Sequence, residues 1–346
     1  TPGAQSQPRT TAVCNKAISG TALHHRFDHL NNRQLLRMQK NSLVHGLEGI
    51  KITTANRHCK SCPLGKSFRK HVPSKTQRDL QTRPLGWVHA DTLSVNKTAI
   101  GGYKYALVLV DDYSRMAWVY LMKSKAETPK MIAEFHLKIA QRNGFHIGCI
   151  HSDNGTEFKN TKLTTYLAQN NIKWHYSAPY APELNGVAER FMRTLMNATR
   201  SKLIHSQLDQ QFWGLALLSA VQVKNISGTD TRDKTPFELF HGTKPDCSAL
   251  RVWGAPSYVH IDPRQSTHND LGHSRSKVGT TSYPAVLVGY ARDSAAWVFW
   301  DIEAHKLREA SYAHATIHEE LNNPREFQFK NPSVRKERNT GLYSEL

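Results

Sequence analysis

The order of apolar patterns between about residue 87 and residue 225 constrains the fold of this chain more than any other feature. Three short strand-like runs come first, close enough together to form an antiparallel meander. Helix-like and strand-like patterns then alternate, which is typical of an α/β layer fold with a mixed sheet. In chain order the patterns predict strands at 87–91, 103–114 and 116–122, a helix at 125–143, a strand at 146–151, a helix at 160–170, a strand at 172–177, and helices at about 185–205 and 209–225.

The ends of the first predicted helix carry specific signals. Ser124 and Glu127 have the spacing of a capping box, in which each side chain bonds to the other residue's backbone N–H. Gly144 follows the last predicted helical residue and suits a C-terminal cap.

The sequence on either side of this central region has a different texture. Short strand-like runs at 249–261, 285–291 and 296–302, split by polar loops, predict a small β-barrel or sandwich. The start of the chain is rich in Thr, Ser, Gln, Pro and Gly. The predicted divisions are a flexible leader at 1–20, a His- and Cys-bearing unit at 21–70, a linker at 71–84, the α/β core at 85–245, the small β-domain at 246–318 and a polar tail at 319–346.

The charge balance favours a polyanionic partner. The chain of 346 residues has 46 Lys and Arg against 28 Asp and Glu, a net charge of +18. This surplus is spread along the chain, and nucleic acid is the partner it favours over a membrane surface, since no long basic amphipathic helix is evident. The sequence has no run of 18 apolar residues and no secretory signal pattern, so no membrane association is expected.

Two further features indicate where such a chain would be found. Its five cysteines are odd in number and sparse, which argues for a reducing compartment rather than a disulfide framework. The first residue is Thr1 rather than Met, which indicates a piece of a longer precursor.

Three acids fall at positions that suit a metal site. Asp91 and Asp153 each follow an apolar strand pattern, so both are predicted at strand ends, and Glu189 lies in the first turns of a predicted helix. Carboxylates that converge at one sheet edge repel each other unless a cation neutralises them, and oxygen ligands suit Mg²⁺ or Mn²⁺. Taken singly, each acid also has an ordinary structural interpretation: an edge acid, a turn residue beside Asn-Gly, and a helix-start residue paired with Arg193.

Four other residues have the composition of a zinc site. His24 and His29 precede Cys59 and Cys62 in the pattern H-x4-H-x29-C-x2-C. Zinc takes four N or S ligands in a tetrahedron, and a Cys-x2-Cys knuckle supplies two of them. A redox pair of cysteines and a surface pair of histidines are the alternatives. The unit has fewer than about 50 residues, so metal binding is expected to contribute much of its folding free energy.

The spacing of these motifs and the sequence around them resemble those of a known family. Asp91 and Asp153 are separated by 61 residues, and Asp153 and Glu189 by 35, which resembles the D,D-35-E signature of retroviral-type integrases. The surrounding words "VHAD", "HSDNGTEF" and "PYAPELNGVAER" match it too. Further on, "VDDYSR", "KTPFELFHGTKP" and "LRVWGAPSYVH" are similar to integrases of Ty1/copia-type retrotransposons. The resemblance covers roughly residues 23–315.

The resemblance implies a fold and an activity. It implies an RNase H-like core in which Asp91, Asp153 and Glu189 hold two divalent ions, and an N-terminal zinc-binding unit with His24, His29, Cys59 and Cys62 as ligands of one structural Zn²⁺. It also implies a small, SH3-like C-terminal β-domain. The implied chemistry is cleavage of element DNA ends by water, then attack of a 3′-hydroxyl on target DNA. Such a protein works as a homo-oligomer on double-stranded DNA in the nucleus, after a virus-like particle stage, with a host chromatin tether as a further partner.

Basic residues near the two predicted sites are candidates for phosphate contacts. They follow the cysteine knuckle or surround Glu189 at the start of its helix. An ordinary solvated surface is the alternative for each taken alone. The predicted DNA-binding residues are Lys66, Arg69, Lys70, Asn185, Arg190 and Arg193.

Other functional classes stay open at this point. A catalytically inactive or domesticated DNA-binding derivative of such an element would carry the same motifs. A cut-and-paste transposase or a ribonuclease H would share the core fold, although the zinc motif and the surrounding words disfavour both. Metal-dependent joining that Asp153→Asn abolishes would exclude the inactive derivative, and hydrolysis of the RNA strand of a hybrid would support the ribonuclease.

Overall fold

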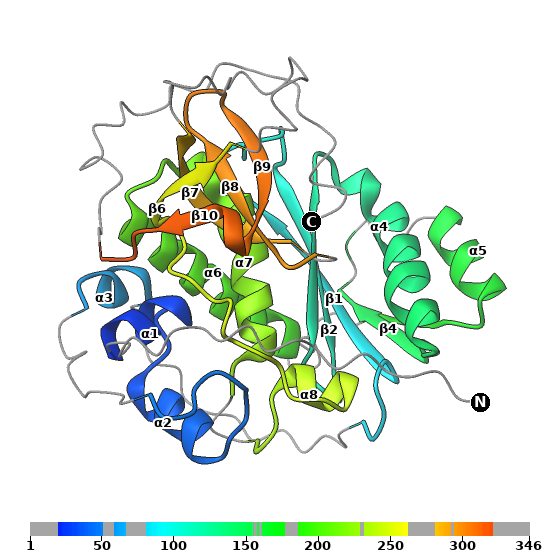
Figure 1. Ribbon diagram of the computed structural model, residues 1–346. Helices are drawn as coiled ribbons and strands as arrows, with labels where there is room; N and C mark the ends of the chain where they lie inside the picture. The colour runs from blue at the N-terminus through cyan, green and yellow to red at the C-terminus, as the bar shows by residue number, and fades with distance from the viewer. Residues whose placement is uncertain are drawn as a thin grey trace, which may run out of the picture.

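The architecture comes from a computed structural model of the chain, shown in Figure 1. It describes residues 20–50, 59–66, 81–153, 155, 158, 161–176, 186–228, 232–261, 281–291 and 294–320. The predicted leader, linker and polar tail lie largely or wholly outside these residues. Among the described helices, none is long and apolar enough to cross a membrane.

The described elements follow the predicted order through the central region. The helices are α1 (Gly20–Arg26), α2 (Asn32–Lys40), α3 (Ser61–Lys66), α4 (Thr128–Phe135), α5 (Thr161–Gln169), α6 (Gly186–Ser206), α7 (Trp213–Ile226) and α8 (Pro236–His241). The strands are β1 (Trp87–Ser94), β2 (Tyr105–Asp111), β3 (Ala117–Met122), β4 (Cys149–Ser152), β5 (Lys173–Tyr176), β6 (Pro256–His260), β7 (Ser282–Tyr290), β8 (Ala296–Asp301), β9 (Lys306–Ser311) and β10 (Ala315–Ile317).

The central sheet is mixed, as the sequence predicts. Its strand order is β3-β2-β1-β4-β5. The first three strands form the antiparallel meander, and β1–β4 and β4–β5 pair in parallel. The parallel strands are reached through α4 and α5, which is the helical crossover that parallel pairing requires. This RNase H-like arrangement confirms the predicted fold class of the core.

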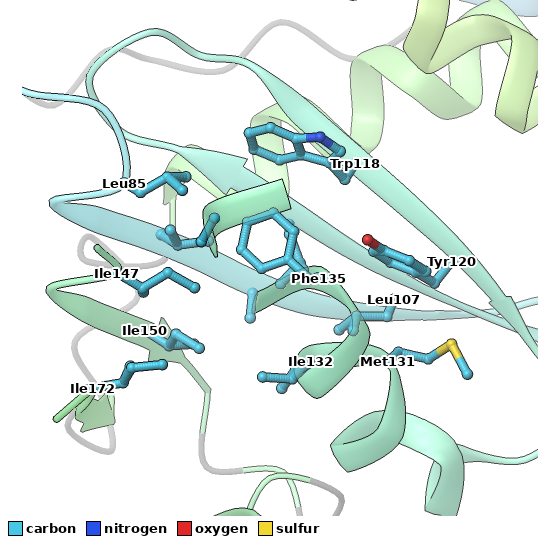
Figure 2. Close-up of a cluster of buried hydrophobic side chains, with 14 of the residues drawn as sticks. Leu85, Leu107, Trp118, Tyr120, Met131, Ile132, Phe135, Ile147, Ile150 and Ile172 are labelled. Carbon is cyan, nitrogen blue, oxygen red and sulfur yellow. The ribbon is translucent and has the colours of Figure 1, made fainter. Parts of the chain in front are cut away.

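Helices cover both faces of this sheet. On one face, α4 and α5 pack on a core that includes Leu107, Ile132, Phe135 and Ile150, all of them fully buried, and Figure 2 shows how Ile132 and Phe135 approach the strands. On the other face, α6 and α7 pack on the alternate residues of β2 and β3. A sheet buried on both sides explains why these strands are almost continuously apolar.

The capping box forms as predicted, at the start of the 3₁₀ turn Lys125–Glu127 that leads into α4. The amide of Ala126 donates to Ser124 Oγ at 3.2 Å, and the amide of Ser124 donates to Glu127 Oε1 at 3.2 Å. The helical segment continues past α4 through a π-helical turn (His136–Ala140) and a 3₁₀ turn (Gln141–Asn143). Gly144 ends it with φ 70°, a left-handed conformation that glycine adopts without a Cβ penalty.

Removing this cap gives a modest, measurable effect. We expect Ser124→Ala to lower the free energy of unfolding by about 1 kcal/mol, because the amide of Ala126 loses its acceptor. Chemical denaturation with a constant m-value measures this change. An unchanged midpoint would show that the cap does not stabilise the helix start.

The C-terminal region forms one five-stranded antiparallel sheet, in the order β10-β6-β7-β8-β9. The predicted strand at 249–261 is shorter than expected, since only Pro256–His260 is extended. Strands β9 and β10 were not predicted, because their sequences KLREAS and ATI are short and have few large apolar residues. In the described residues β9 and β10 do not pair, so the sheet is open rather than a closed barrel.

The N-terminal helices share a hydrophobic core with the rest of the chain. Leu23, Phe27 and Leu35 are buried with Val223 of α7 and with Cys247 and Leu250, which precede β6. Helix α3 also packs against α6, beside which it lies in Figure 1. The N-terminal unit, by which we mean the described residues 20–50 and 59–66, is therefore continuous with the core rather than a separately packed module.

Candidate active site and zinc centre

The register of the parallel strands brings two of the predicted acids to the same level. His89 of β1 pairs with His151 of β4, the last pair that these strands form. Pairing stops there, and β4 ends at Ser152; continued for two more residues, the register would set Asp91 opposite Asp153. Neighbouring strands lie about 4.8 Å apart, which would put the two residues at adjacent positions.

Asp91 differs from its prediction in one respect. It lies inside β1, not at its end, because pairing with β2 continues through Ser94 after pairing with β4 has stopped. Asp153 follows Ser152, the last residue of β4, as predicted. The carboxylate of Asp153 accepts from the Gly155 amide at 3.0 Å, and that of Asp91 accepts from the Thr92 amide at 2.7 Å.

Glu189 belongs to the helix that covers this same face of the sheet. Asp91 is paired with Val108, and directly opposed residues share a face. Val108 is buried together with Phe191, Met192 and Leu195 of α6. Glu189 lies in the first turn of α6 and is exposed. The loop at 177–185, which leads into α6, lies outside the described residues.

The carboxylate oxygens of the three acids do not all lie within 4.8 Å of one another. Among the described residues, the one set of three or more potential ligands whose atoms lie within 4.8 Å of one another is His24, His25, His29 and Cys59. The predicted roles of Asp91, Asp153 and Glu189 therefore rest on strand register and helix placement, and they stay predictions.

A buried polar pair that the sequence analysis did not single out lies beneath the acids. His89 Nε2 is 3.1 Å from Asp112 Oδ1, and both side chains are at most 1% exposed. Arg115 Nη1 donates to the same oxygen at 3.0 Å. A buried charge is retained only where it is paired, so this set ties β1 to the turn after β2. The words "VHAD" and "VDDYSR" contain these residues, but only the fold shows that they meet.

The predicted zinc ligands converge in the N-terminal unit. His24 Nε2 is 3.2 Å from Cys62 Sγ and 3.2 Å from His29 Nδ1, and His29 Nδ1 is 3.2 Å from Cys59 Sγ. Tetrahedral zinc with bonds of about 2.0–2.3 Å would hold its ligand atoms about 3.3–3.8 Å apart, close to these three distances, so these N and S donors suit the ion. The compact group of described residues contains His25 in place of the predicted Cys62. The other ring nitrogen of His24, Nδ1, is 2.8 Å from the Leu30 carbonyl, which leaves Nε2 for the metal.

The protonation of this cluster suits a metal site. Burial lowers the pKa of His24 and of His29 below the usual range, so both imidazoles are neutral at neutral pH. Burial, and secondarily the neighbouring Cys59, raises the pKa of Cys62 to about 11. Metal binding must therefore displace the Cys62 proton, which makes occupancy favourable at higher pH.

Two more histidines border the cluster. The rings of His25 and His205 of α6 lie 4.2 Å apart, centre to centre, and are tilted by 51° to each other. The centre of the His205 ring is 5.4 Å from that of His29. Burial, with further contributions from His205 and His24, lowers the pKa of His25 to about 3. His205 lies at the end of α6, far from the cluster in sequence, so the motif spacing gave no signal for it.

The predicted DNA-binding residues fall in different environments. Lys66 is turned inward, and its ammonium donates to the carbonyls of Asp28 and His29 at 2.9 and 2.8 Å, so a structural role accounts for it. Arg190 and Arg193 are exposed on α6 beside Glu189. Arg69, Lys70 and Asn185 lie outside the described residues.

The strand order of the central sheet places the core in the RNase H-like fold class. Comparison with known families narrows this class. Residues 81–182 match the integrase core domain, and residues 2–67 match the GAG-pre-integrase domain. The two matches follow one another in the order GAG-pre-integrase, then integrase core, which confirms the predicted resemblance. Glu189 lies beyond the matched segment.

The relatives of the chain are much longer proteins. It is 28% identical over 286 residues to the retrovirus-related Pol polyprotein from transposon TNT 1-94 of Nicotiana tabacum, covering 82% of this chain and 20% of that protein. It is 28% identical over 250 residues to the Pol polyprotein from transposon RE1 of Arabidopsis thaliana, covering 72% and 16%. These are Ty1/copia-type transposons. Among solved structures, the chain is similar to one chain of an intasome of simian T-cell lymphotropic virus in complex with PP2A regulatory subunit B56 gamma. The match covers 75% of this chain and 87% of the intasome chain, with 16% identity and a TM-score of 0.42.

Proposed function

We propose that this chain is the integrase segment of a Ty1/copia-type Pol polyprotein and inserts element DNA into host DNA. The observation that supports the proposal is the parallel pairing of β1 with β4 within the segment that matches the integrase core domain. Continued two residues past His89 and His151, this register would set Asp91 opposite Asp153. Glu189 on α6 covers the same face and supplies the third carboxylate.

The three acids are the proposed ligands of two Mg²⁺ or Mn²⁺ ions. Their donors are all carboxylate oxygens, which suits hard cations that complete their shells with water and phosphate oxygens. When bound, such ions stabilise the charge that builds on the phosphate during an in-line displacement. The protein's own contribution is to hold three carboxylates on a rigid strand pair and a packed helix.

The proposed reaction needs no nucleophile from the protein. In strand transfer the 3′-hydroxyl oxygen of an element end forms a bond to a target phosphorus. The bond from that phosphorus to the target's 3′-oxygen breaks, and the proton lost by the attacking hydroxyl is balanced by one taken up by the leaving oxygen. End processing is the same displacement with water as the attacking group. Joining two ends at one target requires a homo-oligomer, which acts in the nucleus with chromatin-bound DNA as its target.

The proposed zinc ligands are His24, His29, Cys59 and Cys62. Three of the pairs, His24–His29, His29–Cys59 and His24–Cys62, are 3.2 Å apart, and these contacts support one structural ion. All four positions are filled by protein atoms, so the ion would stabilise the fold rather than take part in the reaction.

A joining assay tests the proposed activity. A labelled duplex with the recessed 3′ ends of an element terminus is incubated with a plasmid and Mg²⁺ or Mn²⁺, and covalent transfer of the label is measured. Transfer that stops with a chelator supports the proposal. Hydrolysis of the RNA strand of an RNA–DNA hybrid, with no transfer of label, would indicate a ribonuclease instead.

The exposed arginines of α6 give a prediction for DNA binding. We expect Arg193→Ala to weaken binding to duplex DNA and to reduce the slope of log K against log salt by about 1, because one phosphate contact is lost. Fluorescence anisotropy at several salt concentrations measures both quantities. Arg142→Ala is the matched control, since Arg142 is also exposed but follows α4 on the opposite face of the sheet. Equal slopes for the two variants would remove Arg193 from the DNA contact surface.

A further inference from the structure

The turn that carries His29 has an unusual backbone. Asp28 and His29 both adopt left-handed conformations, with φ of 53° and 60°. Each such residue costs about 1–2 kcal/mol unless neighbouring contacts hold it in place. Lys66, which follows the cysteine knuckle, holds this turn from one side by donating to both of its carbonyls.

A second lysine holds the same turn from the catalytic core. Lys202 Nζ of α6 lies 2.9 Å from Asp28 Oδ1, and the two side chains are only 3% and 9% exposed. The same ammonium donates to Ser219 Oγ of α7 at 2.5 Å and lies 6.0 Å from the centre of the Trp253 ring, which precedes the C-terminal sheet. Lys202 thus links the N-terminal unit to two parts of the core through buried polar contacts.

A buried ion pair of this kind needs an explanation other than stability. Removing two charges from water costs several kcal/mol per ion, and an apolar pair of similar volume is often as stable. What the pair does supply is a fixed position for Asp28. Because His29 is the next residue, fixing Asp28 also fixes the direction from which the His29 ring enters the cluster.

We propose that Lys202 is a positioning residue for the zinc centre: through Asp28 it holds His29 in its liganding orientation, so the catalytic core itself determines how tightly the N-terminal unit retains zinc. This inference rests on the proposed zinc site. Outer-sphere contacts that orient metal ligands change metal affinity by about 10–100-fold when removed. The Lys202–Asp28 pair acts one residue further out, on the backbone that carries the His29 ring.

The test measures zinc release rather than DNA joining. Zinc-loaded full-length protein is mixed with excess of a chromogenic chelator, and the release rate is compared among the parent, Lys202→Met, Asp28→Asn and the double variant. Met keeps the length of the lysine stem, and Asn tolerates the left-handed backbone at position 28. We expect release to be about tenfold faster in each single variant. We expect the double variant to release zinc no faster than the singles, since all three lack the same interaction.

The controls separate this inference from the zinc site itself. Lys130→Met replaces an exposed lysine of α4 and is expected to release zinc at the parental rate. A parent that binds no zinc would overturn the zinc proposal itself. A parent that binds zinc, with a double variant that releases it at the parental rate, would overturn the role of Lys202 alone. If a single variant fails to fold because one charge is left buried and unpaired, the double variant, which leaves none, still decides the question.

Discussion

Asp153→Asn is expected to reduce DNA joining by about a thousandfold. Metal ions that clamp the attacking and leaving oxygens contribute several kcal/mol, and about 4 kcal/mol corresponds to a thousandfold in rate. Asparagine keeps the size of the side chain and an oxygen that can still accept from the Gly155 amide, but it removes the charge that a divalent ion needs. Because Asp153 is exposed, the free energy of unfolding should change by no more than about 0.5 kcal/mol.

The control for this variant is an acid on the other side of the sheet. Glu134 of α4 forms a surface pair with Lys138 at 2.8 Å, and such pairs contribute about 0.3–0.5 kcal/mol. Glu134→Gln should therefore join DNA at the parental rate. The joining rate and the thermal midpoint are measured on the same samples. Full activity in Asp153→Asn would exclude this acid from the reaction centre.

Cys62→Ala is expected to release zinc and to unfold the N-terminal unit. Zinc binding contributes about 10–16 kcal/mol in small zinc-finger peptides, so losing the ion removes several kcal/mol even where a hydrophobic core is shared. This core includes Val223 of α7 and Leu250, so the loss should spread beyond the unit and lower the thermal midpoint by at least about 10 °C. Zinc content by atomic absorption and thermal unfolding by circular dichroism check the two effects.

Cys149→Ala is the matched control for the zinc ligand. Cys149 is a buried cysteine of β4 in the central sheet and is not part of the zinc cluster. Its replacement removes a sulfur atom from the core but no zinc ligand. We expect the variant to keep its zinc and to lose about 1 kcal/mol of stability. If Cys62→Ala and Cys149→Ala had the same zinc content and the same midpoint, Cys62 would not be a ligand.

Local signals in the sequence were sufficient for much of the fold. The capping box at Ser124, the glycine cap at Gly144 and the order of strands and helices in the core depend on neighbouring residues, and the structure has them as predicted. The strand that carries Asp91 was predicted too short, because its continuation to Ser94 depends on pairing with β2 rather than on its own apolar pattern. The same reason accounts for the unpredicted β9 and β10, which are extended because they pair.

The candidate site residues could be predicted from sequence motifs, but the residues that contact them could not. The spacing of acids, histidines and cysteines pointed to the two candidate centres. No local pattern indicated that Lys66 faces inward to the turn of His29, or that Lys202 and His205 of α6 contact the N-terminal unit. These contacts join residues more than a hundred positions apart or reverse the usual preference of a lysine for solvent, so only the packed fold reveals them.

The most direct test of the proposed function is a disintegration assay on a branched DNA that mimics a joined element end. It measures strand transfer in reverse, and it depends less than a joining assay does on using the element's true terminal sequence. The parent and Asp153→Asn are compared in Mg²⁺, in Mn²⁺ and with a chelator, in samples shown to be folded and zinc-loaded. A rejoined product from the parent alone, and only with a divalent ion, is the expected result. No product from the parent under any of these conditions would contradict an active integrase and would indicate a derivative that only binds DNA.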